Sequence, residues 1–168
     1  MDEEKLRTRI RIWLIIFIVG LALSGITAFP IETELAFLAH HSSALPAAIG
    51  DWISRVYLAV KDTNARYPCL SYGTDWLAFG HLVIATAFLG PLKDPVKNIW
   101  VIQFGMIACI MVIPLAFIAG PIRHIPAYWR LVDCSFGVFG IIPLYLCYRD
   151  IRKLETMQAK KATSPTRG

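Results

Sequence analysis

Four long apolar stretches constrain the fold of this chain more than any other feature of its sequence. They cover residues 12–29, 76–89, 99–118 and 131–148. A helix needs roughly 20 mostly apolar residues to cross the hydrocarbon core of a bilayer, and the hydrophobic share of 56% exceeds that of an ordinary soluble domain. The sequence therefore predicts an all-α membrane protein, a bundle of four transmembrane helices over approximately 12–29, 74–90, 99–119 and 130–148.

Two of these predicted spans need an additional argument. The first follows a basic segment, as a secretion signal would, but its apolar part is too long and no small-x-small cleavage pattern follows it, so we expect a retained helix. The second is short, and it reaches spanning length only if residues 70–75 lie in the outer interface. Pro68 and Gly73 are expected to break the chain before it.

The segment between the first two spans contains a further helical pattern over approximately 45–62. Apolar residues recur there at helical spacing, and polar residues occupy the other side. The apolar residues are Ile49, Trp52, Ile53, Val56, Tyr57 and Val60. We predict an amphipathic external helix that either lies in the membrane interface or packs as a lid across the bundle.

The basic residues are distributed unevenly between the two faces that four spans would create. One face carries twelve, namely Lys5, Arg7, Arg9, Arg11, Lys93, Lys97, Arg149, Arg152, Lys153, Lys160, Lys161 and Arg167, and the other carries five, namely Arg55, Lys61, Arg66, Arg123 and Arg130. Cytoplasmic segments beside spans are enriched in Lys and Arg. Both termini are therefore expected in the cytoplasm, with the protein in the plasma membrane or a bacterial inner membrane. The partners expected are anionic membrane lipids and a membrane-protein partner or a second copy, and not nucleic acid.

Polar groups gather at the outer ends of the predicted spans. They include Asp75, His81, Arg123, Arg130 and Asp133, which we predict to line a ligand-binding pocket. Charged groups at membrane depth persist mainly when they are paired or line a cavity. The alternative for the two aspartates is structural: each could cap the start of its helix or pair with one of the two arginines. For His81 the alternative is a neutral ring hydrogen-bonded across to Gln103 or Ser135.

Motifs for metal, cofactor or nucleophile chemistry are weak in this sequence. The four cysteines form no C-x-x-C pair, and only one histidine, His81, lies clearly inside a predicted span, which argues against a haem held by two histidines. Serine-nucleophile, phosphate-loop and dinucleotide fingerprints are absent. We therefore predict no metal site and no cofactor.

Together these patterns predict one membrane domain over residues 1–153, followed by a polar, disordered cytoplasmic tail over 154–168. The function expected is non-catalytic: binding of a small ligand or lipid in an outward-facing polar pocket, or service as an accessory membrane subunit. The alternative is a membrane-embedded enzyme or redox protein that acts on a lipid-soluble substrate such as a quinone.

Overall fold

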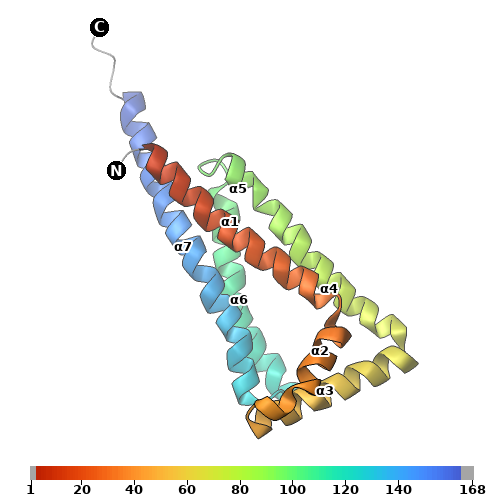
Figure 1. The fold of residues 1–168 in the computed structure, drawn as a ribbon. Coiled ribbons are helices and arrows are strands. Elements are labelled where there is room, and N and C mark those ends of the chain that lie inside the picture. Colours follow the sequence, from red (N-terminus) through yellow and green to blue (C-terminus); the bar gives the residue numbers. More distant parts are fainter. Residues whose placement is uncertain (1–2, 164–168) are drawn as a thin grey trace. The chain divides into compact units, whose positions relative to one another are not determined.

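The structure, a computed structural model, describes residues 3–163, and every regular element in that range is helical. The elements are α1 (Glu3–Ala28), α2 (Ile31–His40), the short 3-10 helix η1 (Ser42–Ala44), α3 (Ala47–Arg66), α4 (Pro68–Ala87), α5 (Leu89–Lys93), α6 (Ile99–Ile122) and α7 (Ala127–Thr163) (Figure 1). The predicted all-α class is confirmed. A helix also forms where the amphipathic pattern predicts one, as α3.

Four helical stretches are long and apolar enough to cross a membrane, and they match the four predicted spans. They are Glu3–Ala28, Pro68–Lys93, Ile99–Ile122 and Ala127–Lys161. In each, only 17–28% of the most apolar window is buried by the rest of the chain. Large side chains such as Ile16, Leu77 and Phe136 are half exposed or more, at 50%, 62% and 66%. Long helices with so much uncovered apolar surface are typical of a membrane protein.

The second of these stretches starts earlier than the sequence pattern predicts. Helix α4 begins at Pro68, and Gly73 lies inside it, so the expectation that Gly73 breaks the chain is wrong. Proline is accepted in the first turn because its missing N–H would have no helical partner there. With α5 directly after α4, the stretch reaches 26 residues, which removes the shortage of length.

The end of α7 also differs from the prediction. The helix continues to Thr163, so the disordered tail is wrong over residues 154–163, and residues 164–168 lie outside the described part of the chain. Leu144, Cys147, Ile151 and Leu154 are fully buried and recur at spacings of three and four. This apolar stripe carries the helix past the end of the predicted span, which composition alone did not indicate.

The chain divides into two compact units, residues 1–19 with 86–168, and residues 20–85. In the first unit, α1 contributes the buried stripe Leu6, Ile10 and Leu14 to a core that also contains Phe88 and the stripe on α7. The rings of Phe17 and Phe88 pack 4.7 Å apart between centroids. This core therefore joins the first half of α1 to α6 and α7.

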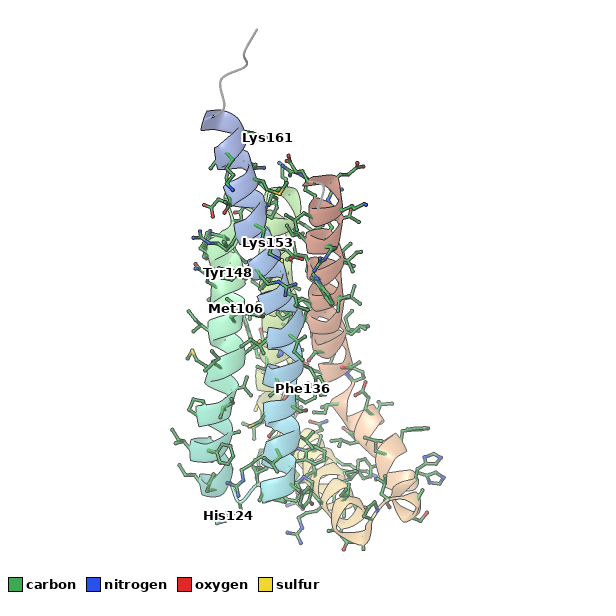
Figure 2. The ribbon with its side chains drawn as sticks, turned by 90° about the vertical axis from the view of Figure 1, so that its left-hand side faces the viewer. Met106, His124, Phe136, Tyr148, Lys153 and Lys161 are labelled. Atoms are coloured by element: carbon green, nitrogen blue, oxygen red, sulfur yellow. The ribbon has the colours of Figure 1, made fainter. Side chains whose placement is uncertain are left out.

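Helices α6 and α7 run antiparallel and approach each other closely at glycines. A Cβ at Gly137 would lie 2.5 Å from the Cys109 carbonyl oxygen, and one at Gly105 would lie 2.9 Å from Leu144 Cδ1 on α7. The turn between the helices places His124 at positive φ, 55°. Figure 2 shows His124 at one end of this pair, and Lys153 and Lys161 toward the other. Small residues thus permit the tight pairing expected of membrane helices.

In the second unit, α2 and α3 pack together through η1, where Gly50 lies against Ser42. A short polar chain then fixes these helices to α4. The Asn64 amide donates a hydrogen bond to the Glu32 carboxylate, and the Ser71 hydroxyl donates one to the Asn64 carbonyl oxygen. Residues from α2, α3 and the first turn of α4 are therefore held together at one end of the unit.

Candidate functional site

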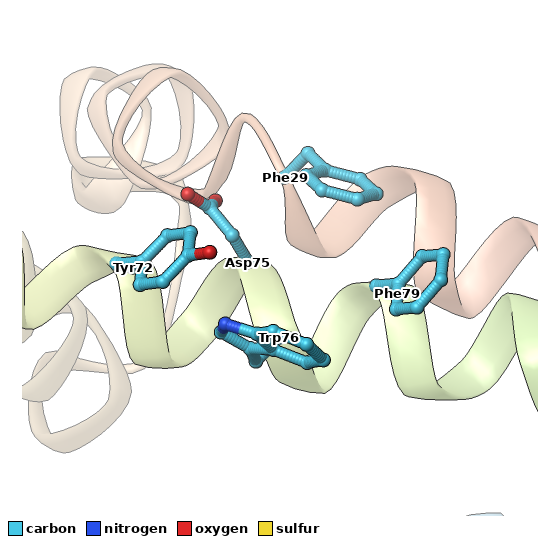
Figure 3. Close-up of a pocket in the computed structure, with 5 residues that line it drawn as sticks. All are labelled: Phe29, Tyr72, Asp75, Trp76 and Phe79. Atoms are coloured by element: carbon cyan, nitrogen blue, oxygen red, sulfur yellow. The ribbon is translucent and has the colours of Figure 1, made fainter.

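A pocket of about 270 Å³ opens in the unit of residues 20–85. Its lining consists of Phe29, Tyr72, Asp75, Trp76 and Phe79 (Figure 3). Four of these lie on α4, and Phe29 directly follows the end of α1. The volume is near the lower limit of small-molecule sites, which span about 300–1,000 Å³, so the pocket fits a small ligand or one group of a larger ligand.

Helical spacing explains how α4 brings its lining residues to one face. Tyr72, Asp75, Trp76 and Phe79 follow one another at intervals of three, one and three residues. Residues three, four and seven apart share one face of an α-helix. The short sequence Tyr72–Phe79 therefore builds most of the pocket by itself.

A close contact between small residues brings the end of α1 to this face. A Cβ at Gly25 would lie 2.8 Å from the Ala78 carbonyl oxygen, and Ala78 is fully buried. Phe29 comes one helical turn after Gly25, and Asp75 comes about one turn before Ala78. In Figure 3 the Asp75 carboxylate points from α4 toward the turn that follows α1, and Phe29 lies on the α1 side of that turn. The Gly25 contact thus brings Phe29 next to the lining face of α4.

The aromatic side chains of α4 form a continuous wall. The ring of Trp76 lies 6.0 Å from Tyr72 at an interplanar angle of 79°, and 6.0 Å from Phe79 at 85°. Edge-to-face pairs at this separation are favourable. The three rings remain half exposed or more, so they present π surface to whatever enters the pocket.

Asp75 is the charged group of the lining, and the structure contradicts one of the structural alternatives for it, the helix cap. Helix α4 begins seven residues before it, so Asp75 is not in the first turn and cannot cap the helix. Within the described residues of its own unit, the half-buried carboxylate has no hydrogen bond and no ion pair. Asp75 is therefore a half-buried acid without a partner in its own unit, which is a costly arrangement.

His81 does not line the pocket. Its Nδ1–H donates a hydrogen bond of 2.8 Å to the Leu77 carbonyl, one turn earlier on α4. The hydrogen bond holds the ring against its own helix. Because His81 comes six residues after Asp75, the two side chains lie on different faces of α4. The structure therefore separates these two predicted site residues.

The other three predicted site residues lie in the unit of residues 1–19 with 86–168. Arg123 directly follows α6 and is exposed. The Arg130 side chain packs against Gly120, and its Cζ lies 6.0 Å from the centre of the Phe117 ring. Among the described residues Asp133 has no ion pair, and α7 begins six residues before it. The expected ion pairing and capping are therefore not found for Asp133, and the five-residue site remains a prediction.

Sequence reasoning missed the most deeply buried charged group among the described residues, Asp150. Its side chain is fully buried, with Oδ2 3.1 Å from Arg9 Nη2 and Oδ1 3.6 Å from Arg149 Nε. Neither oxygen accepts a well-aligned hydrogen bond, so these contacts are ion pairs only. Asp150 lies in line with Cys147, Ile151 and Leu154. An acid within that apolar stripe is the signal that could have identified it.

Comparison with known proteins gives no relative for this chain: no protein-family model matches it, and no curated protein or solved structure matches it significantly. Among the described residues, no three His, Cys, Asp or Glu side chains come together as ligands for a metal ion.

Proposed function

We propose that this chain is an integral membrane protein with four spans, α1, α4 with α5, α6 and α7, and with both termini in the cytoplasm. The length and hydropathy of the four stretches support the spans. The distribution of twelve basic residues on one face against five on the other supports the orientation. In this arrangement α2 and α3 are external, and α3 lies in the interface with Trp52 and Tyr57 at headgroup level.

The function proposed is non-catalytic binding of a small ligand or lipid in the pocket beside Asp75, which opens to the outer face. The observation that carries this proposal is the half-buried Asp75 carboxylate, unpartnered within its unit and set among aromatic rings. Charged groups in or near membrane spans persist mainly where they have a partner or line a cavity. A bound ligand would supply that partner.

An enzyme or redox protein acting on a quinone-like substrate is the less supported alternative. It would need several of the predicted polar residues to act on one substrate. The pocket lining contains only one of them, Asp75, while His81 is hydrogen-bonded to its own helix. Such a lining suits recognition better than acid–base chemistry, which needs donor and acceptor groups within reach of one another.

Replacing Asp75 by asparagine is expected to remove the bound molecule and leave the fold intact. Wild-type protein extracted with its surrounding lipid should carry a specific small molecule or lipid, measured by mass spectrometry. Asp75→Asn should lose most of it, with a stability change below about 0.5 kcal/mol. The control Asp51→Asn removes the same charge from an exposed position on α3 and should retain the molecule.

A different result would assign Asp75 to the fold. If Asp75→Asn lowers stability by about 3–5 kcal/mol and a second change, Arg123→Gln or Arg130→Gln, recovers part of the loss, then Asp75 belongs to a buried ion pair. Equal amounts of the bound molecule in all variants would also contradict the proposed function.

A further inference from the structure

The lining of the Asp75 pocket combines one negative charge with four aromatic rings and no basic side chain. An anionic ligand would meet the carboxylate without a compensating positive charge. A neutral apolar ligand would displace the water that hydrates the carboxylate and would offer no hydrogen bond in its place. The ligand that satisfies this lining is a cation.

The same lining distinguishes an organic cation from a metal ion. Calcium takes six to eight oxygen ligands, and magnesium takes six in octahedral geometry. The pocket offers the two oxygens of Asp75 and the hydroxyl of Tyr72, and its other three residues end in apolar or N–H surface. Ring faces instead attract alkylated ammonium groups, whose charge is spread over methyl and methylene surface.

The arrangement of the rings suits such a group. Tyr72, Trp76 and Phe79 stand edge to face along α4, so neighbouring rings turn their faces in different directions. Phe29 adds a ring from the end of α1, on the side of the pocket across from α4 (Figure 3). A cation in the pocket would therefore meet π surface from two segments and the carboxylate of Asp75.

The geometry points to an alkylated ammonium group as the ligand of this pocket, held by Asp75 and by the rings of Tyr72, Trp76, Phe79 and Phe29. This inference rests on the proposed function and names the ligand class for the same site. Two sources share this chemistry, a free quaternary ammonium compound and the choline headgroup of a lipid. The pocket volume of about 270 Å³ admits an alkylated ammonium group from either source.

The test uses choline and its neutral isostere 3,3-dimethylbutanol, titrated against the purified full-length protein in a detergent without an ammonium group and followed by ligand-detected NMR. We expect choline to bind at least about tenfold more tightly than the isostere. Asp75→Asn and Trp76→Leu should each weaken choline binding by about tenfold or more.

Two matched controls separate the pocket from general effects of charge and ring loss. Asp51→Asn removes an equal charge, and Trp100→Leu removes a ring of similar exposure, 62% against 58% for Trp76. Both should leave choline binding unchanged. Nanodiscs of phosphatidylcholine and phosphatidylglycerol distinguish the two sources. Weaker choline binding in the first identifies the lipid headgroup, and equal binding in both identifies a free cation.

Three results would overturn the inference: no choline binding, equal binding of the neutral isostere, or no effect of Asp75→Asn. The proposed function has a separate outcome. If mass spectrometry finds an anionic or neutral molecule that is lost in Asp75→Asn, the pocket binds a ligand and only the ligand class is wrong. If the protein carries no such molecule and choline does not bind, both proposals fail.

Discussion

Replacing Arg9 by methionine is expected to lower the free energy of unfolding by about 3 kcal/mol. The change keeps the apolar stem of the side chain and removes the charge that lies 3.1 Å from the buried Asp150 carboxylate. Removing one partner of a buried ion pair typically costs about 3–5 kcal/mol because the other charge remains buried and uncompensated. We expect the lower end of this range, since the Arg9 side chain is 39% exposed and Arg149 stays 3.6 Å from Asp150.

The double variant Arg9→Met/Asp150→Leu should be more stable than Arg9→Met alone, because it leaves no buried charge behind. Denaturant unfolding of the purified protein measures both changes. The control is Arg11→Met, which removes an exposed charge two residues away on α1. If Arg9→Met is within about 0.5 kcal/mol of this control, then the pair between α1 and α7 does not stabilise the fold.

The second large effect is expected at Gly137, where alanine should destabilise the protein by about 2–3 kcal/mol. A Cβ at this position would lie 2.5 Å from the Cys109 carbonyl oxygen, which is backbone and cannot turn aside. The α6 and α7 helices would have to separate to admit it. Thermal or denaturant unfolding gives the size of the loss.

The same substitution at Gly80 serves as the control, because a Cβ there would meet nothing within 4 Å. Gly80→Ala should be neutral or stabilising by up to about 1 kcal/mol, since alanine loses less conformational freedom in a helix than glycine does. Equal effects of the two substitutions would mean that Gly137 does not set the distance between α6 and α7.

The four long apolar helices could be predicted from sequence because their signal is local: length and hydropathy suffice. Their ends could not, for different physical reasons. Pro68 and Gly73 suggested a break in the chain before the second span. Proline fits the first turn of a helix, however, and α4 begins at Pro68. Beyond residue 153 the polar composition hid Leu154, whose burial against the core extends α7.

The candidate site was predictable in part. Asp75 is recognisable in the sequence as a charged residue beside a predicted span. Tyr72 and Phe79 lie three and four residues from it, and Trp76 lies four residues after Tyr72, so the sequence also indicates that they share its helical face. Phe29 could not be assigned in this way, because its place depends on the contact of Gly25 with α4. The start of α4 at Pro68 then removed the capping alternative that the sequence left open.

Asp150, in contrast, could not be predicted as a buried, paired acid from the sequence. In the sequence, the basic residues near it, Arg9 and Arg149, indicate only the orientation in the membrane, and no pattern assigns a role to Asp150. Its significance follows from a contact between α1 and α7, which are far apart in the sequence. A non-local ion pair of this kind leaves only a faint local sign, a charged residue in an apolar stripe.

Labelling of the native Cys69 most directly tests the central claim, a four-span protein whose pocket opens to the outside. Cys69 is exposed in the first turn of α4, at the end that carries Tyr72 and Asp75, whereas Cys109 is half-buried inside α6 and Cys134 and Cys147 are buried. A membrane-impermeant maleimide should label sealed right-side-out vesicles as fully as detergent-opened ones, and Cys69→Ser should abolish the signal. Labelling of Cys69 only in inside-out vesicles would contradict the proposed orientation and place the pocket on the cytoplasmic face.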